Sequence, residues 1–173
     1  NEVIKPSVDG LVKDSLDFKG FLYAGLMLTS DGPKVLEYNC RFGDPEAQAV
    51  LPLIKGDFAS YLMDGAKGNL NHSLINFDEG WSICLVLASA GYPNSSRNGD
   101  LISGFENIDN ARVYHAGTKK NTDGNFVTNG GRVLAVVGRG DTREIAVENT
   151  YLEAEKIQFD GNQRRSDIGR MHF

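Results

Sequence analysis

Residues 21–39 predict a β-hairpin, and this hairpin is the strongest structural signal in the chain. Two apolar runs, 21–29 and 34–39, flank a Ser-Asp-Gly-Pro turn sequence at residues 30–33. Asp-Gly between two apolar runs favours a tight turn, because glycine adopts positive φ without a steric penalty. The chain is therefore expected to fold back on itself here and to return as a strand that ends near Asn39.

Two helices are predicted beyond this hairpin. Asp44 is expected to cap the first helix, with a proline at its first position and a glutamate near the positive end of its dipole. Pro52 should end or kink this helix. Asp57 is expected to cap the second helix, which Gly68 should stop.

The returning strand of the hairpin carries polar side chains at alternate positions. Glu37, Asn39 and Arg41 would share one face, because successive side chains of a strand point to opposite faces. A carboxylate and an amide oxygen side by side suit a hard cation such as Mg²⁺, and a guanidinium suits a phosphate or a carboxylate. The pattern predicts an enzyme that handles a metal–nucleotide together with an anionic substrate.

A solvated strand face is the alternative interpretation of these three side chains, since short motifs of this kind often arise by chance. The other face of the strand is apolar, the preceding strand is apolar on both faces, and the run ends in Gly-Asp-Pro-Glu. A strand covered on both faces has little reason to carry Glu, Asn and Arg unless they are paired or functional. The context therefore shifts the interpretation towards a functional site.

Composition excludes several classes of function. The 173-residue chain is 40% apolar and 24% charged, and its net charge of −5 argues against a nucleic-acid binder. Its basic residues are scattered, with Arg164-Arg165 the only notable cluster near the end, and no apolar run is long enough to span a membrane. Cys40 and Cys84 form neither a disulfide framework nor a metal motif, so the cytoplasm is the expected setting. Because the chain opens on Asn1, we expect a piece of a longer protein.

The second half of the chain predicts a small β-rich domain. Residues 69–80 are polar and predict a connection, after which an apolar run from Trp81 is typical of a buried strand. Further strands are expected at 112–118, 125–129 and 132–138. The fold class is α+β, with a first domain over residues 1–70 and a second over residues 71–173.

A closing helix is predicted after these strands. Asp141 is expected to cap it, with Glu144 at the spacing of a capping box. Its apolar positions recur at helical spacing and predict a single buried face. That face comprises Val147, Thr150, Tyr151, Ala154 and Ile157.

Six segments, in chain order, carry a family resemblance. They are Leu22-Tyr-Ala-Gly-Leu-Met, Gly32-Pro-Lys-Val-Leu-Glu-Tyr-Asn-Cys-Arg-Phe-Gly-Asp-Pro-Glu, Ala90-Gly-Tyr-Pro, His115-Ala-Gly-Thr-Lys, Thr128-Asn-Gly-Gly-Arg-Val-Leu and Asp167-Ile-Gly. Together they resemble the glycinamide ribonucleotide synthetase family, also called phosphoribosylamine–glycine ligases, of the ATP-grasp superfamily. The run from Asn39 to Glu46 is specific to this family, whereas the Glu-x-Asn pair is shared across ATP-grasp enzymes.

The resemblance implies the second half of an ATP-grasp core followed by a small β-rich domain. It also implies the substrates glycine and 5-phosphoribosylamine, with ATP and Mg²⁺ (or Mn²⁺) as cofactors. ATP would phosphorylate the glycine carboxylate, and the amine would then attack the acyl phosphate. The product would be glycinamide ribonucleotide, in an early step of purine synthesis.

Several site residues follow from the resemblance. Glu37 and Asn39 match the family's metal ligands, and Arg41 matches the arginine that follows them, which we assign to phosphate or acyl-phosphate charge. Leu26 and Met27 lie on the facing strand, where they would touch adenine or simply belong to the core.

Other assignments concern the substrates. Asp44 is a candidate for the metal or the substrate amine, with helix capping as its alternative role. Arg132 or Lys119 would hold the ribose phosphate, beside backbone N–H groups of Asn129-Gly130-Gly131; the alternative is a tight hairpin with exposed bases. His115 is interpreted as a structural histidine, and Cys40 is given no catalytic role.

The family's phosphate-covering glycine loop and nucleotide-binding lysines lie upstream of the matched region. Neither is recognisable in this sequence, so the isolated chain is expected to bind ATP weakly and not to turn over. Two alternatives stay open. One is another ATP-grasp carboxylate–amine ligase, of the biotin carboxylase or formate-using kind, and the other is a non-catalytic assembly module.

Overall fold

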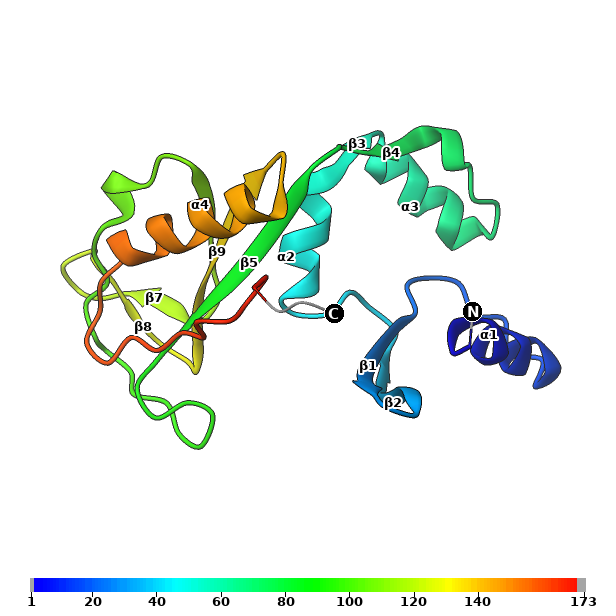
Figure 1. Ribbon diagram of the computed structural model, residues 1–173, viewed down its shortest axis with the longest axis horizontal. Helices are drawn as coiled ribbons and strands as arrows, with labels where there is room; N and C mark the ends of the chain where they lie inside the picture. Colours follow the sequence, from blue (N-terminus) through cyan, green and yellow to red (C-terminus); the bar gives the residue numbers. More distant parts are fainter. Residues whose placement is uncertain (1, 171–173) are drawn as a thin grey trace. The chain divides into compact units, whose positions relative to one another are not determined.

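The predicted hairpin forms in the computed structural model, which describes residues 2–170 (Figure 1). Strand β1 (Tyr23–Thr29) pairs antiparallel with β2 (Gly32–Asn39), and Gly32 closes the turn at φ +92°. The pairing register shifts between Gly25, which faces Glu37, and Leu26, which faces Val35. Leu36 is therefore an extra residue in β2, and this β-bulge separates the polar end of the strand from its turn end.

The chain divides into two compact units. Unit 1 comprises the chain up to Asp44 together with Ile54–Phe77, and unit 2 comprises Pro45–Leu53 and the chain from Asp78 onward. Helices and antiparallel sheets occur in both units, which confirms the α+β class. No helix within residues 2–170 is long and apolar enough to cross a membrane.

Unit 1 contains four elements that the sequence did not predict. Helix α1 (Ile4–Lys13) includes a proline in its first turn, where the missing N–H is tolerated. The expected connection over residues 69–80 was wrong in part, because it contains the 3-10 helix η2 (His72–Leu74) and strand β4 (Ile75–Phe77). Strand β4 pairs with β3 (Ile54–Gly56).

Helix α3 (Phe58–Lys67) of unit 1 has both predicted ends. Its N-cap is Asp57, whose side chain accepts a hydrogen bond from the Ser60 N–H at 3.0 Å. Its C-cap is Gly68, in the left-handed conformation at φ +75°. The local chemistry of caps was thus sufficient to place this helix.

Unit 2 begins with helix α2 (Glu46–Val50) and the 3-10 helix η1 (Leu51–Leu53). Pro52 lies within η1, so the α-helix ends before it, as predicted. The prediction that Asp44 caps α2 was wrong: Pro45 occupies the N-cap position, and no side-chain capping hydrogen bond is made there.

The main sheet of unit 2 has the strand order β5-β9-β6, with both pairings antiparallel. Its strands are β5 (Trp81–Ala88), β9 (Arg132–Gly140) and β6 (Ala111–His115). A second, two-stranded sheet pairs β7 (Thr118–Lys120) with β8 (Phe126–Thr128), and the 3-10 helix η3 (Phe105–Asn107) precedes β6. The strand expected over 112–118 is therefore two strands in different sheets, and the tight hairpin through Asn129-Gly130-Gly131 is absent from the described pairings.

The core of unit 2 lies between the main sheet and helix α4 (Arg143–Lys156), which packs along β5 and β9 (Figure 1). The predicted apolar face of α4 is confirmed, because its members are buried against the sheet. The predicted cap was wrong by one residue: Thr142 accepts from the Ile145 N–H at 3.3 Å. The opposite face of the sheet carries Cys84, Ala135 and Val137, which pack with Ala49 of α2.

Candidate functional site

The polar end of β2 places Glu37 beside Asn39 in unit 1. Both belong to β2, where Glu37 faces Gly25 and Asn39 faces Tyr23. The Asn39 Nδ2 donates a hydrogen bond to Glu37 Oε1 at 3.0 Å, so the two side chains lie together as strand alternation predicts. Glu37 is exposed and Asn39 half-buried, so these two candidate ligands lie at the surface of the hairpin.

Gly25 leaves room for the Glu37 side chain. A Cβ at position 25 would lie 3.0 Å from Glu37 Cγ, which is tighter than ordinary van der Waals contact. An acidic side chain at this position would therefore stand directly against Glu37. Because Gly25 has no side chain, it adds no third oxygen-bearing group beside Glu37 and Asn39, which remain the candidate ligands of the hairpin.

Arg41 lies outside the strand that the sequence assigned to it. Strand β2 ends at Asn39, and Arg41 follows in a bend with its guanidinium donating to the Phe42 carbonyl at 2.7 Å. Strand alternation therefore does not place Arg41 on the Glu37 face. It lies two residues beyond Asn39 and is exposed.

The facing strand β1 presents Leu26 and Met27 at the surface. Their exposed fractions are 41% and 52%, so neither belongs to a core among the described residues. Because side chains alternate along β1, Met27 shares the face of Gly25 and hence of Glu37, whereas Leu26 lies on the opposite face. Of the two, Met27 is the residue that shares a face with the Glu37–Asn39 pair.

The carboxylate of Glu37 and the amide of Asn39 suit a hard cation, but two side chains do not complete its coordination shell. Carboxylate and amide oxygens are the ligands that Mg²⁺ prefers, and such sites usually draw further oxygens from substrate phosphates and water. Among residues 2–170 no group of three His, Cys, Asp or Glu side chains is placed to hold a metal. The described chain thus supplies two oxygen-bearing side chains here, and Asp44 lies further along, exposed, before α2.

Unit 2 contains a cavity of about 440 Å³ whose lining includes three arginines. They are Arg132, at the start of β9, and Arg164 and Arg165 of the C-terminal segment. Residues of β5, including Leu85 and Val86, form part of the wall, and the described lining contains no carboxylate. From the sequence alone, Arg164-Arg165 stood out only as a basic pair. Its position just before Asp167-Ile-Gly was the signal available.

Each guanidinium of this cavity has a defined partner. Arg132 Nε donates to the Tyr92 hydroxyl at 3.0 Å, and Arg164 lies 3.9 Å from the Glu155 carboxylate. Arg165 makes two hydrogen bonds to Asp167, at 2.8 and 2.5 Å. These bonds raise the pKa of Arg165 and lower the pKa of Asp167, so both groups stay ionised at neutral pH.

The segment that carries Arg164 and Arg165 is fastened at both ends. Gln163 forms an antiparallel bridge with Ala88, through hydrogen bonds of 2.8 and 2.9 Å. At the other end the buried Tyr151 hydroxyl accepts from the Ile168 N–H at 3.0 Å and lies 3.2 Å from the Arg165 carbonyl, to which it donates. These contacts hold the arginine pair close to β5, although the two segments are distant in the sequence.

The glycines at 130 and 131 serve close packing. A Cβ at Gly131 would lie 2.4 Å from the Tyr92 ring, and one at Gly130 would lie 3.1 Å from the Gly117 Cα. The Asn129 N–H donates to the Gly117 carbonyl at 2.8 Å. The double glycine therefore lets Tyr92 approach the start of β9, where it meets Arg132.

His115 and Lys119 lie elsewhere in unit 2. The His115 ring packs 4.5 Å from the Phe126 ring, centroid to centroid, and its Nδ1 lies 2.9 Å from the Thr118 hydroxyl, as expected for a structural histidine. Lys119 is exposed on β7 opposite Val127. It is not among the described residues that line the arginine cavity.

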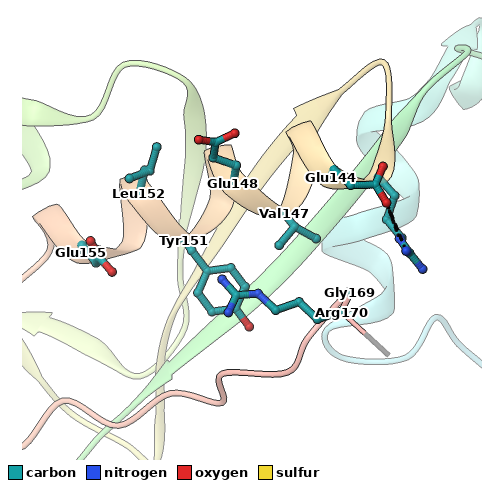
Figure 2. A pocket seen from close by; sticks show the side chains of 9 residues that line it. Glu144, Val147, Glu148, Tyr151, Leu152, Glu155, Gly169 and Arg170 are labelled. Atoms are coloured by element: carbon teal, nitrogen blue, oxygen red, sulfur yellow. Dashed lines mark hydrogen bonds and ion pairs between the residues drawn. The ribbon is translucent and has the colours of Figure 1, made fainter. Parts of the chain in front are cut away.

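A second hollow of about 450 Å³ runs along α4 (Figure 2). In this hollow the Arg170 guanidinium lies over the Tyr151 ring, 4.1 Å from its centroid. This cation–π contact is a further interaction that holds the C-terminal segment against α4. Glu148 and Glu155 project from the same helix, and Glu144 pairs with Arg143 at 3.1 Å. The mixed and exposed charges fit a solvated helix face. Tyr151, which lines this hollow, helps to hold the C-terminal segment through its contacts with Arg165, Ile168 and Arg170.

Comparison with known proteins assigns both units to one enzyme family. Residues 82–171 match the C domain of phosphoribosylglycinamide synthetase, and residues 1–47 match its ATP-grasp (A) domain. A phosphoribosylamine–glycine ligase of Caldanaerobacter subterraneus is 47% identical over 96% of this chain. A trifunctional purine biosynthetic protein of Chironomus tentans is 42% identical over the whole chain, which corresponds to 13% of that protein.

Solved structures agree with this assignment. The crystal structure of phosphoribosylamine–glycine ligase from Thermotoga maritima superimposes with a TM-score of 0.81 and 36% identity, over 96% of this chain and 41% of that one. The biotin carboxylase domain of a Hydrogenobacter thermophilus 2-oxoglutarate carboxylase, solved with MgADP and bicarbonate, has a TM-score of 0.58 at 17% identity over 92% of this chain and 37% of that one, which shows a shared fold.

The match covers nearly all of this chain but less than half of each ligase relative. The Caldanaerobacter enzyme is matched over only 40% of its length, so this chain spans about two fifths of such a ligase. Within this chain, however, the C-domain match covers more than half of the residues. On this evidence the chain belongs to the phosphoribosylglycinamide synthetase family.

Proposed function

We propose that this chain is the C-terminal part of a cytoplasmic ATP- and Mg²⁺-dependent ligase that joins glycine to 5-phosphoribosylamine. The Glu37–Asn39 pair carries the proposal, because it brings a carboxylate and an amide side chain into hydrogen-bond contact at the surface of the hairpin that matches the ATP-grasp domain. Residues 1–70 would supply the C-terminal half of the ATP-grasp core, and residues 71–173 the β-rich C-terminal domain.

The reaction joins two substrates through a phosphorylated carboxylate. A glycine carboxylate oxygen attacks the γ-phosphorus of ATP, forming glycyl phosphate and releasing ADP. The amine nitrogen of phosphoribosylamine then attacks the acyl carbon. A C–N bond forms, phosphate leaves and the nitrogen loses a proton. Catalysis of this kind depends on positioning and charge neutralisation.

Unit 1 would hold the nucleotide side of this reaction. Glu37 and Asn39 would bind Mg²⁺, which when bound neutralises charge on the ATP phosphates. Arg41 would neutralise phosphate or acyl-phosphate charge, since a guanidinium fork matches phosphate oxygens. Met27, on the Glu37 face, and Leu26, on the other, are the apolar candidates for contact with adenine.

Three further residues are candidates for contact with the substrates. Arg132 and Lys119 are the candidates for the ribose phosphate, and Asp44 is the candidate for the substrate amine. Because the chain covers about 40% of its ligase relatives, the remaining nucleotide-binding groups would come from upstream polypeptide. The isolated chain should therefore bind ATP weakly and fail to turn over.

The proposal is tested in a chimera in which this chain replaces the matching part of the Thermotoga maritima ligase. The chimera should release ADP only when both glycine and phosphoribosylamine are present. The Glu37→Gln variant should lower the rate about a hundredfold or more, because a metal ligand is lost. Asp31→Asn, at the exposed turn of the same hairpin, is the matched control and should keep the parent rate.

Three outcomes would contradict the proposal. Turnover with bicarbonate or formate in place of glycine would favour another ATP-grasp ligase. An effect of Glu37→Gln on thermal stability alone, with nucleotide binding unchanged, would favour an assembly module. Glycine-dependent turnover by the isolated 173-residue chain would show that no upstream lobe is required.

A further inference from the structure

Two Asn-Gly pairs occur in the sequence, and both lie in unit 2. They are Asn98-Gly99, in the loop after β5, and Asn129-Gly130, in the turn between β8 and β9. The side-chain carbonyl carbon of an asparagine is open to attack by the backbone nitrogen of the next residue. Glycine leaves that nitrogen unhindered, because it has no Cβ. Both asparagines are exposed, so only the local fold distinguishes their reactivity.

The nitrogen that would attack Asn98 is already engaged. The Gly99 N–H donates a hydrogen bond to the Thr128 carbonyl at 2.8 Å. A third exposed asparagine with a small residue after it, Asn94, is protected in the same way, because the Ser95 N–H donates to the Gly91 carbonyl at 3.0 Å. In both places the nitrogen must give up its acceptor before it can turn towards the side chain.

The nitrogen that follows Asn129 has no such restraint. Within residues 2–170 neither the Gly130 N–H nor the Asn129 side chain makes a hydrogen bond, although most backbone N–H groups of folded proteins are paired. The turn itself is anchored on either side. The Asn129 N–H donates to the Gly117 carbonyl at 2.8 Å, and the Gly131 carbonyl accepts from the Ser89 N–H at 2.9 Å. The anchors thus leave both reacting groups of the Asn129-Gly130 pair without a hydrogen-bond partner.

We infer that Asn129 is a site of spontaneous deamidation, with Gly130 as the internal nucleophile. The Gly130 nitrogen attacks Asn129 Cγ, so an N–Cγ bond forms and the Cγ–Nδ2 bond breaks. Ammonia leaves with the proton that the Gly130 nitrogen gives up, and a cyclic succinimide remains. Water then opens the ring at one of its two carbonyl groups, which gives aspartate or isoaspartate. Water is the only co-reactant, and no oxidation or reduction takes place.

The modification would disturb a closely packed turn. A Cβ at Gly130 would lie 3.1 Å from the Gly117 Cα, and one at Gly131 would lie 2.4 Å from the Tyr92 ring. Isoaspartate inserts a methylene group into the backbone, for which these contacts leave little room. The turn also gains a carboxylate shortly before Arg132, whose Nε donates to the Tyr92 hydroxyl. Deamidation at Asn129 should therefore lower the stability of unit 2.

The test follows deamidation of the full 173-residue chain during storage in a mildly alkaline buffer. Trypsin releases Asn129 and Asn98 in separate peptides, residues 121–132 and 98–112, and fragment mass spectra locate the asparagine that has changed. Asn129 should convert about tenfold faster than Asn98, because the Gly130 nitrogen breaks no hydrogen bond before it reacts. Asn94 should also be slower than Asn129.

Unfolding provides the matched control for sequence context. In concentrated urea the native hydrogen bond of Gly99 is lost, so the two Asn-Gly pairs should convert at similar rates. The Asn129→Gln variant should remove most of the mass gain from the peptide 121–132 and leave that of the peptide 98–112 unchanged. Together these measurements assign the difference in rate to the fold.

Two results would overturn the inference: equal rates at Asn98 and Asn129 in the folded chain, or an excess at Asn129 that persists unchanged in urea. The effect on packing has its own test. The isoaspartate form, separated by ion exchange, should have a lower urea midpoint than Asn129→Asp, which carries the same charge on a normal backbone. Equal midpoints for these two forms would show that the turn accommodates the added methylene group.

Discussion

In unit 2 the apolar side chains of β5, β9 and α4 form a buried core, whereas in unit 1 those of α1, β1 and β2 remain exposed. The buried apolar residues of the described chain all lie between Ile83 and Phe159. Helices α1 and α3 of unit 1 bury no residue, although their apolar positions recur at helical spacing. Large exposed apolar surfaces usually mark interaction sites.

The difference between the units bears on function. Unit 2 contains both a core and the arginine cavity, so its site can be formed by its own packing. Unit 1 carries the Glu37–Asn39 pair on a hairpin whose Leu28 and Leu36 are 63% and 64% exposed. In the proposed ligase, upstream polypeptide would cover such surfaces, and the metal site would become rigid only then. The comparison therefore predicts that substitutions act very differently in the two units.

The largest expected difference is between buried and exposed leucines. Leu87→Ala empties a fully buried position of β5 and should cost unit 2 about 2–5 kcal/mol of unfolding free energy. Leu28→Ala, at an exposed position of β1, should cost less than about 0.5 kcal/mol. Urea denaturation followed by fluorescence of Trp81, the single tryptophan, reports unit 2 directly. A comparable midpoint shift for Leu28→Ala would break the comparison.

Much of the local structure could be predicted because local chemistry determines it. The Asp-Gly turn, the Asp57 and Gly68 caps and the buried face of α4 depend on neighbouring residues. The β3–β4 pair could not be predicted, because each strand has three residues and their pairing is non-local. The bulge at Leu36 likewise depends on register between two strands rather than on either sequence alone.

The candidate sites show the same division. Glu37 and Asn39 are two residues apart on one strand, so alternation placed them together. Arg132 and the Arg164-Arg165 pair are distant in sequence and share a cavity because Gln163 bridges to Ala88 and Tyr151 holds the backbone at Arg165. No spacing rule connects them, and their shared site emerged only from the tertiary structure.

A smaller effect is expected from the buried carboxylate of unit 2. Glu153 is 3% exposed and accepts from Lys156 Nζ at 2.9 Å and from the Asp109 N–H at 3.1 Å. Burial alone would raise the pKa of Glu153, but the Lys156 and backbone hydrogen bonds outweigh it and lower the pKa. Its contribution to stability should therefore be complete above the ordinary glutamate pKa and lost as pH falls through the lowered one.

This sign gives a pH test. At pH 7 Glu153→Gln should destabilise unit 2 by about 1–3 kcal/mol, because a charged hydrogen-bonding partner is lost. The difference from the parent chain should shrink as pH falls below about 4.5, the ordinary value for glutamate. Urea midpoints measured from pH 7 to pH 3 check this, with Glu148→Gln on the exposed face of α4 as control. If the stability difference between the parent chain and Glu153→Gln grew in acid, the pKa of Glu153 would be raised rather than lowered.

The smallest expected effects come from the helix caps, and they sharpen the comparison most directly. Thr142→Ala removes the acceptor for the Ile145 N–H and should cost about 1 kcal/mol. Because α4 packs on the core, this cost should appear in the Trp81 transition. Asp57→Ala removes the acceptor for the Ser60 N–H, but α3 buries no residue, so that transition should not move. Amide exchange should instead quicken within α3 alone.

The pH dependence of the two caps separates them further. Hydrogen bonds from the Ser60 side chain and N–H lower the pKa of Asp57, so its cap should persist above the ordinary aspartate pKa and fail in acid. The Thr142 hydroxyl does not itself titrate, so acid should weaken its cap less than the cap at Asp57. In acid, the amide exchange rate of α3, corrected for the intrinsic rate at each pH, should therefore rise towards the rate of the Asp57→Ala variant. If α3 exchange followed the Trp81 transition instead, the two units would unfold together and their stabilities could not be treated separately.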